Sequence, residues 1–112
     1  PEGDWRILGR LDHIVNTGGE KVNPVEVENA VIETTLAAGC LTMGIPDPDW
    51  GERLVAFCTP STTDVIRLEK ALQTKLTGAA IPKLIVPVDE LPINEMGKPD
   101  LLKARAVLEQ RD

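Results

Sequence analysis

The sequence predicts an α+β domain in which a short β-hairpin and a small sheet are flanked by about three helices. Apolar runs of strand length alternate irregularly with amphipathic segments of helical length, unlike the strict strand–helix alternation of parallel α/β folds. The 112 residues suffice for one compact domain, residues 1–112. The 42% hydrophobic and 27% charged residues are ordinary for a globular protein.

The first half of the chain predicts two short strands, a turn, a helix and a strand pair. Residues 5–8 and 13–16 are expected to be strands, and adjacent glycines at 18 and 19 allow a turn between 17 and 20. A helix is expected from Asn23, which can cap it, to about Leu36, because Pro24 suits the first helical position and Glu26 can complete a capping box. Two apolar runs, 41–45 and 53–59, are expected to pair.

The second half predicts two more helices around one strand and a loop. Asp64 can cap a helix whose apolar side chains recur at helical spacing, namely Val65, Leu68, Leu72 and Leu76. Residues 84–88 are expected to be a strand and residues 92–97 a loop. The last helix should open near Asp100, with Leu101, Ala104 and Leu108 on one face.

The charge and the apolar pattern argue against several classes of partner. The net charge of −6 and pI of about 4.8 lack the basic surplus of a nucleic-acid-binding protein. No apolar run approaches the roughly 20 residues of a membrane span, and no secretory signal is visible. We therefore expect a cytoplasmic protein. Because the chain begins Pro1-Glu2-Gly3-Asp4 rather than with Met, we also expect it to be a segment of a longer protein.

The two cysteines, Cys40 and Cys58, lie in separate apolar runs, and His13 is the only histidine. This set is too small for a zinc site, so no metal-ligating residues are predicted. Buried free thiols are the favoured interpretation. A disulfide remains the alternative, which the sequence leaves open.

Two glycine–lysine sites are candidates for contact with a phosphate-bearing ligand. Neither Gly97-Lys98 nor Gly18-Gly19 with Lys21 fits the phosphate-binding loop, which needs Gly, four residues and then Gly-Lys-Ser/Thr. Gly18-Gly19 can let a slender ligand approach the backbone closely. Lys98, on a loop before a helix, could be carried into the active site of another domain. A solvated turn lysine is the alternative for each site.

Three segments together resemble the C-terminal domain of adenylate-forming enzymes, which include acyl-CoA synthetases, luciferases and peptide-synthetase adenylation domains. Residues 9–28 are similar to its opening motif. Residues 44–47, 50–52 and 55–57 are similar to its central strands, and residues 88–92 with Asn94 and Gly97-Lys98 to its terminal motif. The motifs occur in the family's order over almost the whole chain.

The resemblance implies a small lid domain of an ATP-dependent, AMP-forming acid–thiol ligase. A carboxylate attacks the α-phosphate of ATP, giving an acyl-adenylate and pyrophosphate, and a thiol, usually that of CoA, then displaces AMP. The lid rotates between the two steps. The implied partners are the N-terminal adenylation domain, a small carboxylate, ATP and CoA. Mg²⁺ should accompany ATP, held mainly by the N-terminal domain, so this segment should be inert alone.

The resemblance also assigns roles by position. Lys98 matches the catalytic lysine of adenylation, and Asp12 matches the hinge about which the domain rotates. Arg10 matches an arginine near the nucleotide. Gly18 and Gly19 match the loop beside the pantetheine tunnel. Lys21 adjoins that loop and could meet a CoA phosphate.

Alternatives remain for four of these assignments, and the sequence also departs from the family pattern. Arg10 could pair with a carboxylate, Asp12 could cap, and the glycines could only permit a turn. Pro99-Asp100 stands where the family usually has an aliphatic and then a basic residue, which could shift the helix start and Lys98. Residues 78–83 also look shortened and less basic than usual.

The leading function is an acyl-CoA ligase, because residues 18–28 resemble CoA ligases more than peptide-synthetase domains. Within the ligases, Gly18-Gly19-Glu20-Lys21 followed by Asp49-Trp50-Gly51 is most similar to o-succinylbenzoate-CoA ligases of menaquinone or phylloquinone synthesis. Two alternatives are an adenylation domain that loads a carrier-protein thiol and a non-catalytic interaction module of the same fold.

Overall fold

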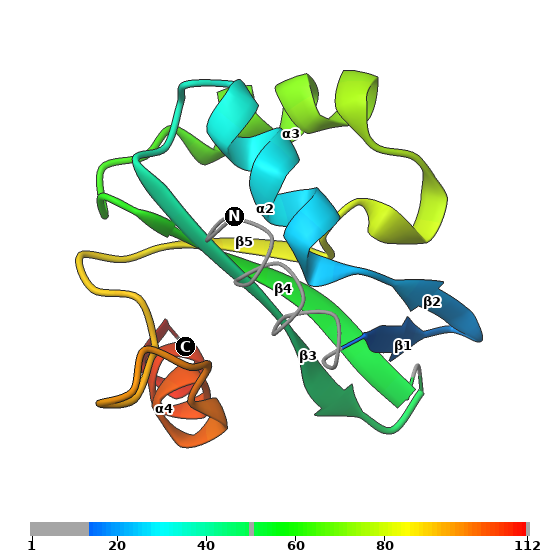
Figure 1. The fold of residues 1–112 in the computed structure, drawn as a ribbon, viewed down its shortest axis with the longest axis vertical. Helices are drawn as coiled ribbons and strands as arrows, with labels where there is room; N and C mark the ends of the chain where they lie inside the picture. The colour runs from blue at the N-terminus through cyan, green and yellow to red at the C-terminus, as the bar shows by residue number, and fades with distance from the viewer. Residues whose placement is uncertain (1–13, 50, 112) are drawn as a thin grey trace, which may run out of the picture.

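The computed structural model describes residues 14–49 and 51–111. Its centre is one five-stranded sheet with helices on both faces (Figure 1). The strands are β1 (Val15–Thr17), β2 (Glu20–Val22), β3 (Gly39–Asp47), β4 (Gly51–Thr59) and β5 (Leu84–Pro87). The helices are α2 (Pro24–Glu33), α3 (Val65–Lys75) and α4 (Leu101–Arg111), with a short 3₁₀ turn, η1, at Gly78–Ala80. The α+β prediction is confirmed.

The sheet is built around β4, which is paired on both sides. β3 and β4 form a long antiparallel pair from Gly39↔Thr59 to Asp47↔Gly51. β1 joins the start of β4 antiparallel at Thr17↔Gly51 and forms a hairpin with β2. β5 lies parallel to β4 from Val55↔Leu84 to Cys58↔Pro87. The strands at 41–45, 53–59 and 84–88 were predicted nearly at their observed bounds.

Side chains that alternate along β4 fill two separate cores, because successive residues of a strand point to opposite faces. Leu54, Ala56 and Cys58 pack against the face covered by α2 and α3. Val55 and Phe57 face the other side, where Ala104 of α4 completes the second core. These five side chains of β4, residues 54–58, are fully buried. The sheet therefore carries a two-helix layer on one face and α4 on the other (Figure 1).

Helix α2 begins where expected and ends earlier than expected. The Asn23 side chain accepts a hydrogen bond from Val25 N at 2.9 Å, and Pro24 is the first helical residue. The helix stops at Glu33 rather than at about Leu36. Thr34 Oγ1 donates to Val31 O at 2.6 Å, and Thr35 then takes a left-handed φ of 60°. This local turn ends the helix.

Helices α3 and α4 both start at aspartates, as predicted. Asp64 accepts from Arg67 N at 3.2 Å and Asp100 accepts from Lys103 N at 3.1 Å. Along α3, Leu68 and Leu72 are fully buried. Along α4, Ala104 is fully buried, whereas Leu101 and Leu102 are exposed. α4 therefore has the smaller buried face of the two.

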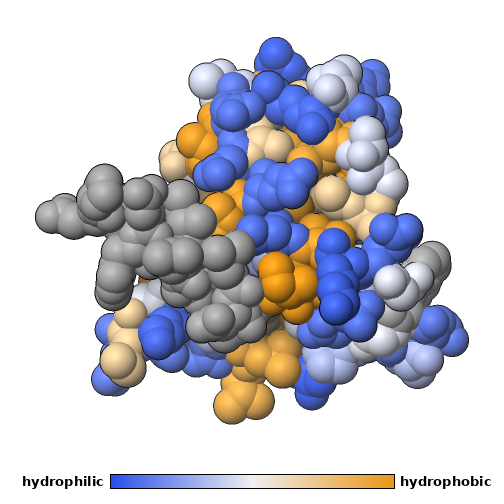
Figure 2. Space-filling view, turned by 45° about the vertical axis from the view of Figure 1, so that its right-hand side comes forward, coloured by the Kyte–Doolittle hydropathy of each residue, from blue (hydrophilic) through white to orange (hydrophobic). Residues whose placement is uncertain are grey.

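The surface in Figure 2 shows hydrophilic residues spread over much of one face, with apolar residues between them. Among the described residues, six large apolar side chains are exposed, and they are spread along the chain: Ile14, Ile32, Ile66, Met96, Leu101 and Leu102. Three of these six, Met96, Leu101 and Leu102, lie near Lys98 in the sequence.

Candidate functional site

The loop that carries Lys98 leaves the sheet after β5 and returns into α4. Its two limbs are held by an antiparallel bridge between Ile93 and Pro99. Asn94 N donates to Lys98 O at 2.8 Å, and Asp100 N donates to Pro92 O at 2.9 Å. Pro99, which has no N–H, occupies a position in this bridge where none is needed. Residues 92–100 therefore form a closed loop. It includes residues 92–97, where a loop was predicted.

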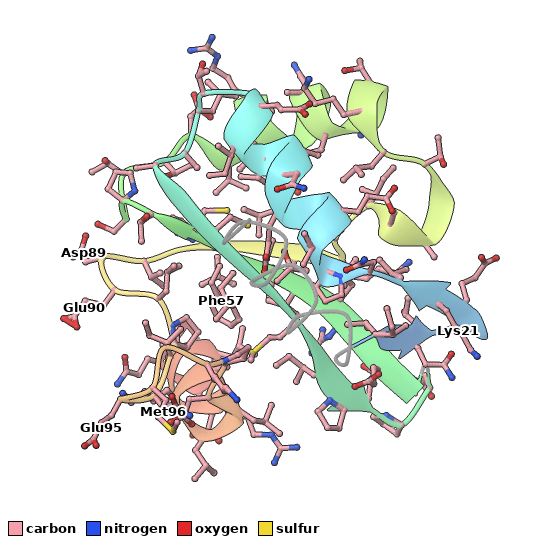
Figure 3. The ribbon with its side chains drawn as sticks, viewed as in Figure 1. Lys21, Phe57, Asp89, Glu90, Glu95 and Met96 are labelled. Atoms are coloured by element: carbon pink, nitrogen blue, oxygen red, sulfur yellow. The ribbon has the colours of Figure 1, made fainter. Side chains whose placement is uncertain are left out.

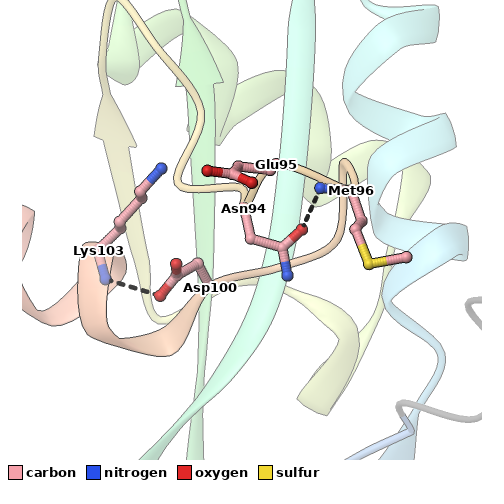
Figure 4. A pocket seen from close by; sticks show the side chains of 5 residues that line it. All are labelled: Asn94, Glu95, Met96, Asp100 and Lys103. Carbon is pink, nitrogen blue, oxygen red and sulfur yellow. Dashed lines mark hydrogen bonds between the residues drawn. The ribbon is translucent and has the colours of Figure 1, made fainter.

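The tip of this loop is organised by Asn94. Its Oδ1 accepts from Met96 N at 2.8 Å and from Lys98 N at 3.1 Å (Figure 4). Gly97 N donates to Asn94 O at 2.9 Å, and Gly97 has φ of 78°. A positive φ is strained for residues with a Cβ, which explains a glycine before Lys98. The short Asn side chain thus substitutes for missing backbone partners.

Lys98 itself is exposed, whereas its backbone is fixed. Its N–H and its C=O are both bonded to Asn94. Asp100 caps α4 two residues later, so Pro99-Asp100 does not displace the helix start from its predicted place. The loop presents the Lys98 ammonium on a long side chain at the surface of the domain. An exposed lysine on a fixed backbone is suited to enter a site formed with another domain.

An open hollow of about 420 Å³ adjoins the loop. Figure 4 shows the five side chains that line it: Asn94, Glu95, Met96, Asp100 and Lys103. Lys103 spans the base of the loop, since its Nζ donates to Ile93 O at 2.8 Å. This contact joins the first turn of α4 to the first limb of the loop.

The second candidate site is the hairpin between β1 and β2. Gly18 and Gly19 have φ of 60° and 85°, and positive φ at both central residues is the form of hairpin turn that matches strand twist. A Cβ added at Gly19 would meet nothing within 4 Å, so the turn is open on that side. Glu20 and Lys21 are exposed. The turn explains both glycines, and the open space leaves room for a ligand.

The two candidate sites lie at different ends of the domain. In Figure 3, Lys21 lies on strand β2 of the hairpin, and Glu95 and Met96 are at the opposite end, beside α4. Arg10 and Asp12, the predicted nucleotide-contacting and hinge residues, lie outside the described residues. The structure therefore places Lys98 and the Gly18–Gly19–Lys21 group apart and does not test the other two assignments.

In residues 14–49 and 51–111, no group of three or more His, Cys, Asp or Glu side chains could hold a metal ion. This part of the chain therefore offers Mg²⁺ no ready-made cluster of three such side chains. Over the same residues, no helix has the length and apolar character needed to cross a bilayer.

Cys40 and Cys58 lie opposite each other on β3 and β4, and both are free thiols. Their sulfur atoms are 3.9 Å apart. The pKa of the Cys40 thiol is raised, because its hydrogen bond with Cys58 and its burial both disfavour a thiolate. The prediction of free, buried thiols holds for Cys58, which is fully buried, whereas Cys40 is only partly buried.

Sequence reasoning missed the contacts that Asn94 and Lys103 make around Lys98. Asn94 could have been found from its spacing, because an Asn shortly before a glycine is typical of a side-chain-closed turn. The contact of Lys103 with Ile93 O has no local sequence signal, since it joins two elements that only the fold brings together.

The comparisons with known proteins agree with this geometry. The model of the AMP-binding enzyme C-terminal domain matches residues 26–98. The chain belongs to this family. The match extends from the helix after the glycine hairpin to Lys98 and so spans most of the described sheet.

The relatives of this chain include CoA ligases and triostin synthetase I. The chain is 33% identical over 98% of its length to a medium/long-chain-fatty-acid–CoA/3-oxocholest-4-en-26-oate–CoA ligase of Mycolicibacterium smegmatis. It is 35% identical over 87% of its length to a feruloyl-CoA synthase of an Amycolatopsis species. It is 36% identical over 96% of its length to triostin synthetase I of Streptomyces triostinicus. The chain spans only 20%, 20% and 21% of these relatives.

Solved structures show the same fold. The domain is similar to part of an acyl-CoA synthetase of Brucella canis, with a TM-score of 0.71 and 26% identity over 93% of this chain. It is also similar to part of apo MatB from Rhodopseudomonas palustris, with a TM-score of 0.74 and 28% identity over 88% of this chain. In each case it covers 20% of the solved chain.

Proposed function

We propose that this chain is the C-terminal domain of an AMP-forming acyl-CoA ligase and that Lys98 is its adenylation lysine. One structural observation carries the proposal, namely an exposed lysine whose backbone is fixed at both N–H and C=O on a closed loop. The family membership and the CoA ligases among the relatives support it. The reaction is adenylation of a carboxylate by ATP, followed by transfer of the acyl group to CoA.

Lys98 serves the first step by its charge. As the carboxylate oxygen bonds to the α-phosphorus, negative charge builds on the phosphate oxygens and pyrophosphate leaves. A cation held near those oxygens stabilises this charge more in the transition state than in the ground state. The long, exposed side chain can reach a nucleotide held by the other domain, while the fixed backbone limits where the ammonium can go.

The glycine hairpin serves the second step. Gly19 leaves open space beside the backbone, and Lys21 stands exposed two residues later. A slender pantetheine arm can pass close to such a turn, and an ammonium nearby can attract a CoA phosphate. In Figure 3, Lys21 of the hairpin lies far from Glu95 and Met96 of the loop that carries Lys98, which fits a domain that turns different ends toward one partner in the two steps. Asp12 is proposed as the hinge and Arg10 as a nucleotide contact.

The test compares two half-reactions in the full-length enzyme that contains this segment. Lys98→Ala should lower pyrophosphate release by about 10²–10³-fold, the usual loss of one oxyanion-stabilising group. Conversion of supplied acyl-adenylate to acyl-CoA should change less than about twofold, since Lys98 acts in the first step only. Lys70→Ala, at an exposed lysine of α3, is the control and should affect neither half-reaction. Equal losses in both half-reactions would contradict the role given to Lys98.

The acyl group is chosen by the N-terminal domain, so the substrate is proposed on motif likeness alone. We include o-succinylbenzoate, of menaquinone or phylloquinone synthesis, as the favoured member of a carboxylate panel with fatty and aromatic acids. A turnover on o-succinylbenzoate at least about tenfold above the other acids in kcat/KM would support this refinement.

A second candidate is an adenylation domain that loads a carrier-protein thiol, and the likeness to triostin synthetase I favours it. The two functions differ only in the thiol that accepts the acyl group. Offering the acyl-adenylate either CoA or a phosphopantetheinylated carrier protein separates them. Faster transfer to CoA supports the ligase, and faster transfer to the carrier supports the alternative. If the unmodified full-length protein transfers the acyl group to neither acceptor and forms no adenylate, a non-catalytic module is favoured.

A further inference from the structure

Asn94 makes four hydrogen bonds to other residues of the Lys98 loop. Its side-chain Oδ1 accepts from two backbone N–H groups, those of Met96 and Lys98. Its own backbone N–H donates to Lys98 O, and its C=O accepts from Gly97 N. Four hydrogen bonds thus connect this residue to Met96, Gly97 and Lys98.

These bonds act on the backbone of Lys98 and leave its side chain free. Both Asn94 and Lys98 are exposed, so neither is held in place by packing in a core. Gly97, between them, has no Cβ and a positive φ, so it does little by itself to hold the backbone. Without Oδ1 of Asn94, the Lys98 N–H would lose its partner within the loop. The direction in which the lysine leaves the loop therefore depends on Asn94.

We propose that Asn94 is a positioning residue for adenylation, which sets the departure direction of the Lys98 side chain through the Oδ1 bonds to Met96 N and Lys98 N. This proposal rests on the function proposed above for Lys98. Asn94 is not a catalytic residue, because it is assigned no contact with substrate. It acts by reducing the orientations available to the ammonium, and a small misplacement of a charged group costs much of its effect on a transition state.

Two contacts at the base of the loop hold its ends and leave the tip to Asn94. Lys103 Nζ bonds to Ile93 O, and Asp100 N bonds to Pro92 O. Neither contact reaches Met96 or Gly97. Loss of the Asn94 side chain should therefore loosen the tip while the base and α4 stay formed.

The variants isolate the Oδ1 acceptor. Asn94→Leu has a similar size but no acceptor, whereas Asn94→Asp keeps an oxygen at the same place. Within the described residues, only Oδ1 of the Asn94 side chain is engaged in hydrogen bonds, so Asp should replace it. Asn23→Leu is the matched control. It removes the same kind of side-chain bond, to Val25 N, at the start of α2.

The expected result, in the full-length enzyme, is selective for the first half-reaction. Asn94→Leu should lower kcat for adenylation by about 10–100-fold, less than Lys98→Ala, because the ammonium is misplaced rather than removed. Asn94→Asp should restore kcat to within about threefold, and acyl transfer from supplied adenylate to CoA should change less than about twofold. Asn23→Leu should lower stability without a selective loss of adenylation.

A double variant separates positioning from a general structural role. If Asn94 acts through Lys98, then adding Asn94→Leu to Lys98→Ala should cause no further loss of adenylation, because the group to be positioned is already gone. Additive losses, equal losses in both half-reactions, or wild-type adenylation in Asn94→Leu would each overturn the proposal. If Lys98→Ala itself leaves adenylation intact, the function proposed for Lys98 fails first and takes the positioning role with it.

Amide hydrogen exchange gives a readout that does not depend on activity. In Asn94→Leu, the Met96 and Lys98 amides should exchange at least about tenfold faster, since each loses its acceptor, while the β3–β4 amides keep their protection. Faster exchange with unchanged adenylation would show that the loop contacts exist but do not position Lys98. Unchanged exchange would show that Oδ1 does not hold the loop at all.

Discussion

Single residues in this domain act mainly by setting backbone direction. Asn23, Asp64 and Asp100 start the three helices by accepting backbone N–H groups that have no partner within the first turn. Asn94 uses the same chemistry in a loop. Each of these side chains is short and polar, so it can fold back on its own backbone at little entropic cost.

Gly97 offers a test at the scale of one residue. Its φ is 78°, and a Cβ added there would meet nothing within 4 Å. The cost of Gly97→Ala should therefore come from backbone strain alone, about 1–2 kcal/mol in the free energy of unfolding. Urea denaturation measures this change. Glu95→Ala, two residues earlier and exposed, should shift the free energy by less than about 0.5 kcal/mol. Equal effects of the two variants would contradict the strain at Gly97.

At the scale of an element, α3 is attached to the sheet by one narrow apolar face. Leu68 is fully buried, whereas Ile66, two residues earlier, is 66% exposed. Leu68→Ala should lower the free energy of unfolding by about 2–5 kcal/mol, because it leaves a cavity beneath the helix. Ile66→Ala removes a comparable side chain from solvent-exposed surface and should cost less than about 0.5 kcal/mol. Thermal or urea unfolding of both variants checks the contrast, which would be absent if α3 packed by its other face.

The pairing of β3 with β4 predicts that a disulfide can form between Cys40 and Cys58. Val88 N bonds to Cys58 O, so the backbone of Cys58 faces β5 and not β3. Cys40 and Cys58 are therefore a non-hydrogen-bonded cross-strand pair, whose Cα atoms lie about 4.5 Å apart, within the range that a disulfide spans. Treatment with diamide should join them, seen by mass spectrometry as loss of two hydrogen atoms and of both alkylatable thiols.

The same reaction should be slow. Thiol oxidation by diamide begins with a thiolate, and the pKa of Cys40 is raised by its hydrogen bond with Cys58 and by burial. The same hydrogen bond lowers the pKa of Cys58, but the Cys58 side chain is fully buried, so diamide has no direct access to it. The rate should therefore fall below that of an exposed cysteine and rise with pH. Cys40→Ser should abolish the cross-link, and a cross-linked dimer in place of the intrachain bond would contradict the opposed geometry.

On the scale of the whole molecule, the domain presents two candidate sites from one rigid sheet. The glycine hairpin extends from one end and the Lys98 loop from the other (Figure 3). Both are exposed, and the described residues contain no metal-ligating cluster. The chain covers 20% of the relatives it resembles, so the rest of the active site is proposed to lie in the other domain.

This arrangement predicts that the 112-residue chain is folded but inactive by itself. Incubated with ATP, Mg²⁺ and the carboxylate panel, it should release no pyrophosphate above the rate without protein. An exposed lysine alone neither binds and orients the nucleotide nor excludes water from the reacting groups, and adenylation needs both. Circular dichroism and cooperative urea unfolding serve as the control for folding. Pyrophosphate release by the isolated chain would show that the domain holds a complete site.

The sequence by itself determined most of the order and bounds of the described elements, but it missed the short strand β2 and the 3₁₀ turn η1. The strand expected at residues 5–8 lies outside the described residues. Caps at Asn23, Asp64 and Asp100 and apolar periodicity are local signals, so they identify where helices and strands begin. It also singled out Lys98 and the glycine hairpin through motif likeness. It placed the end of α2 too late, because the turn at Thr34 and Thr35 depends on a hydroxyl bond and a left-handed φ that the apolar pattern does not encode.

Only the tertiary structure decided which of these elements meet. It brought β5 parallel to β4, set Cys40 opposite Cys58, and put α4 on the face away from α2 and α3. It also revealed how Asn94 and Lys103 hold the Lys98 loop. The physical reason is the separation along the sequence over which each interaction acts. Propensity and capping act within a few residues, whereas strand register and the two-sided burial of β4 are chosen by which pairing buries the most apolar surface across the whole chain.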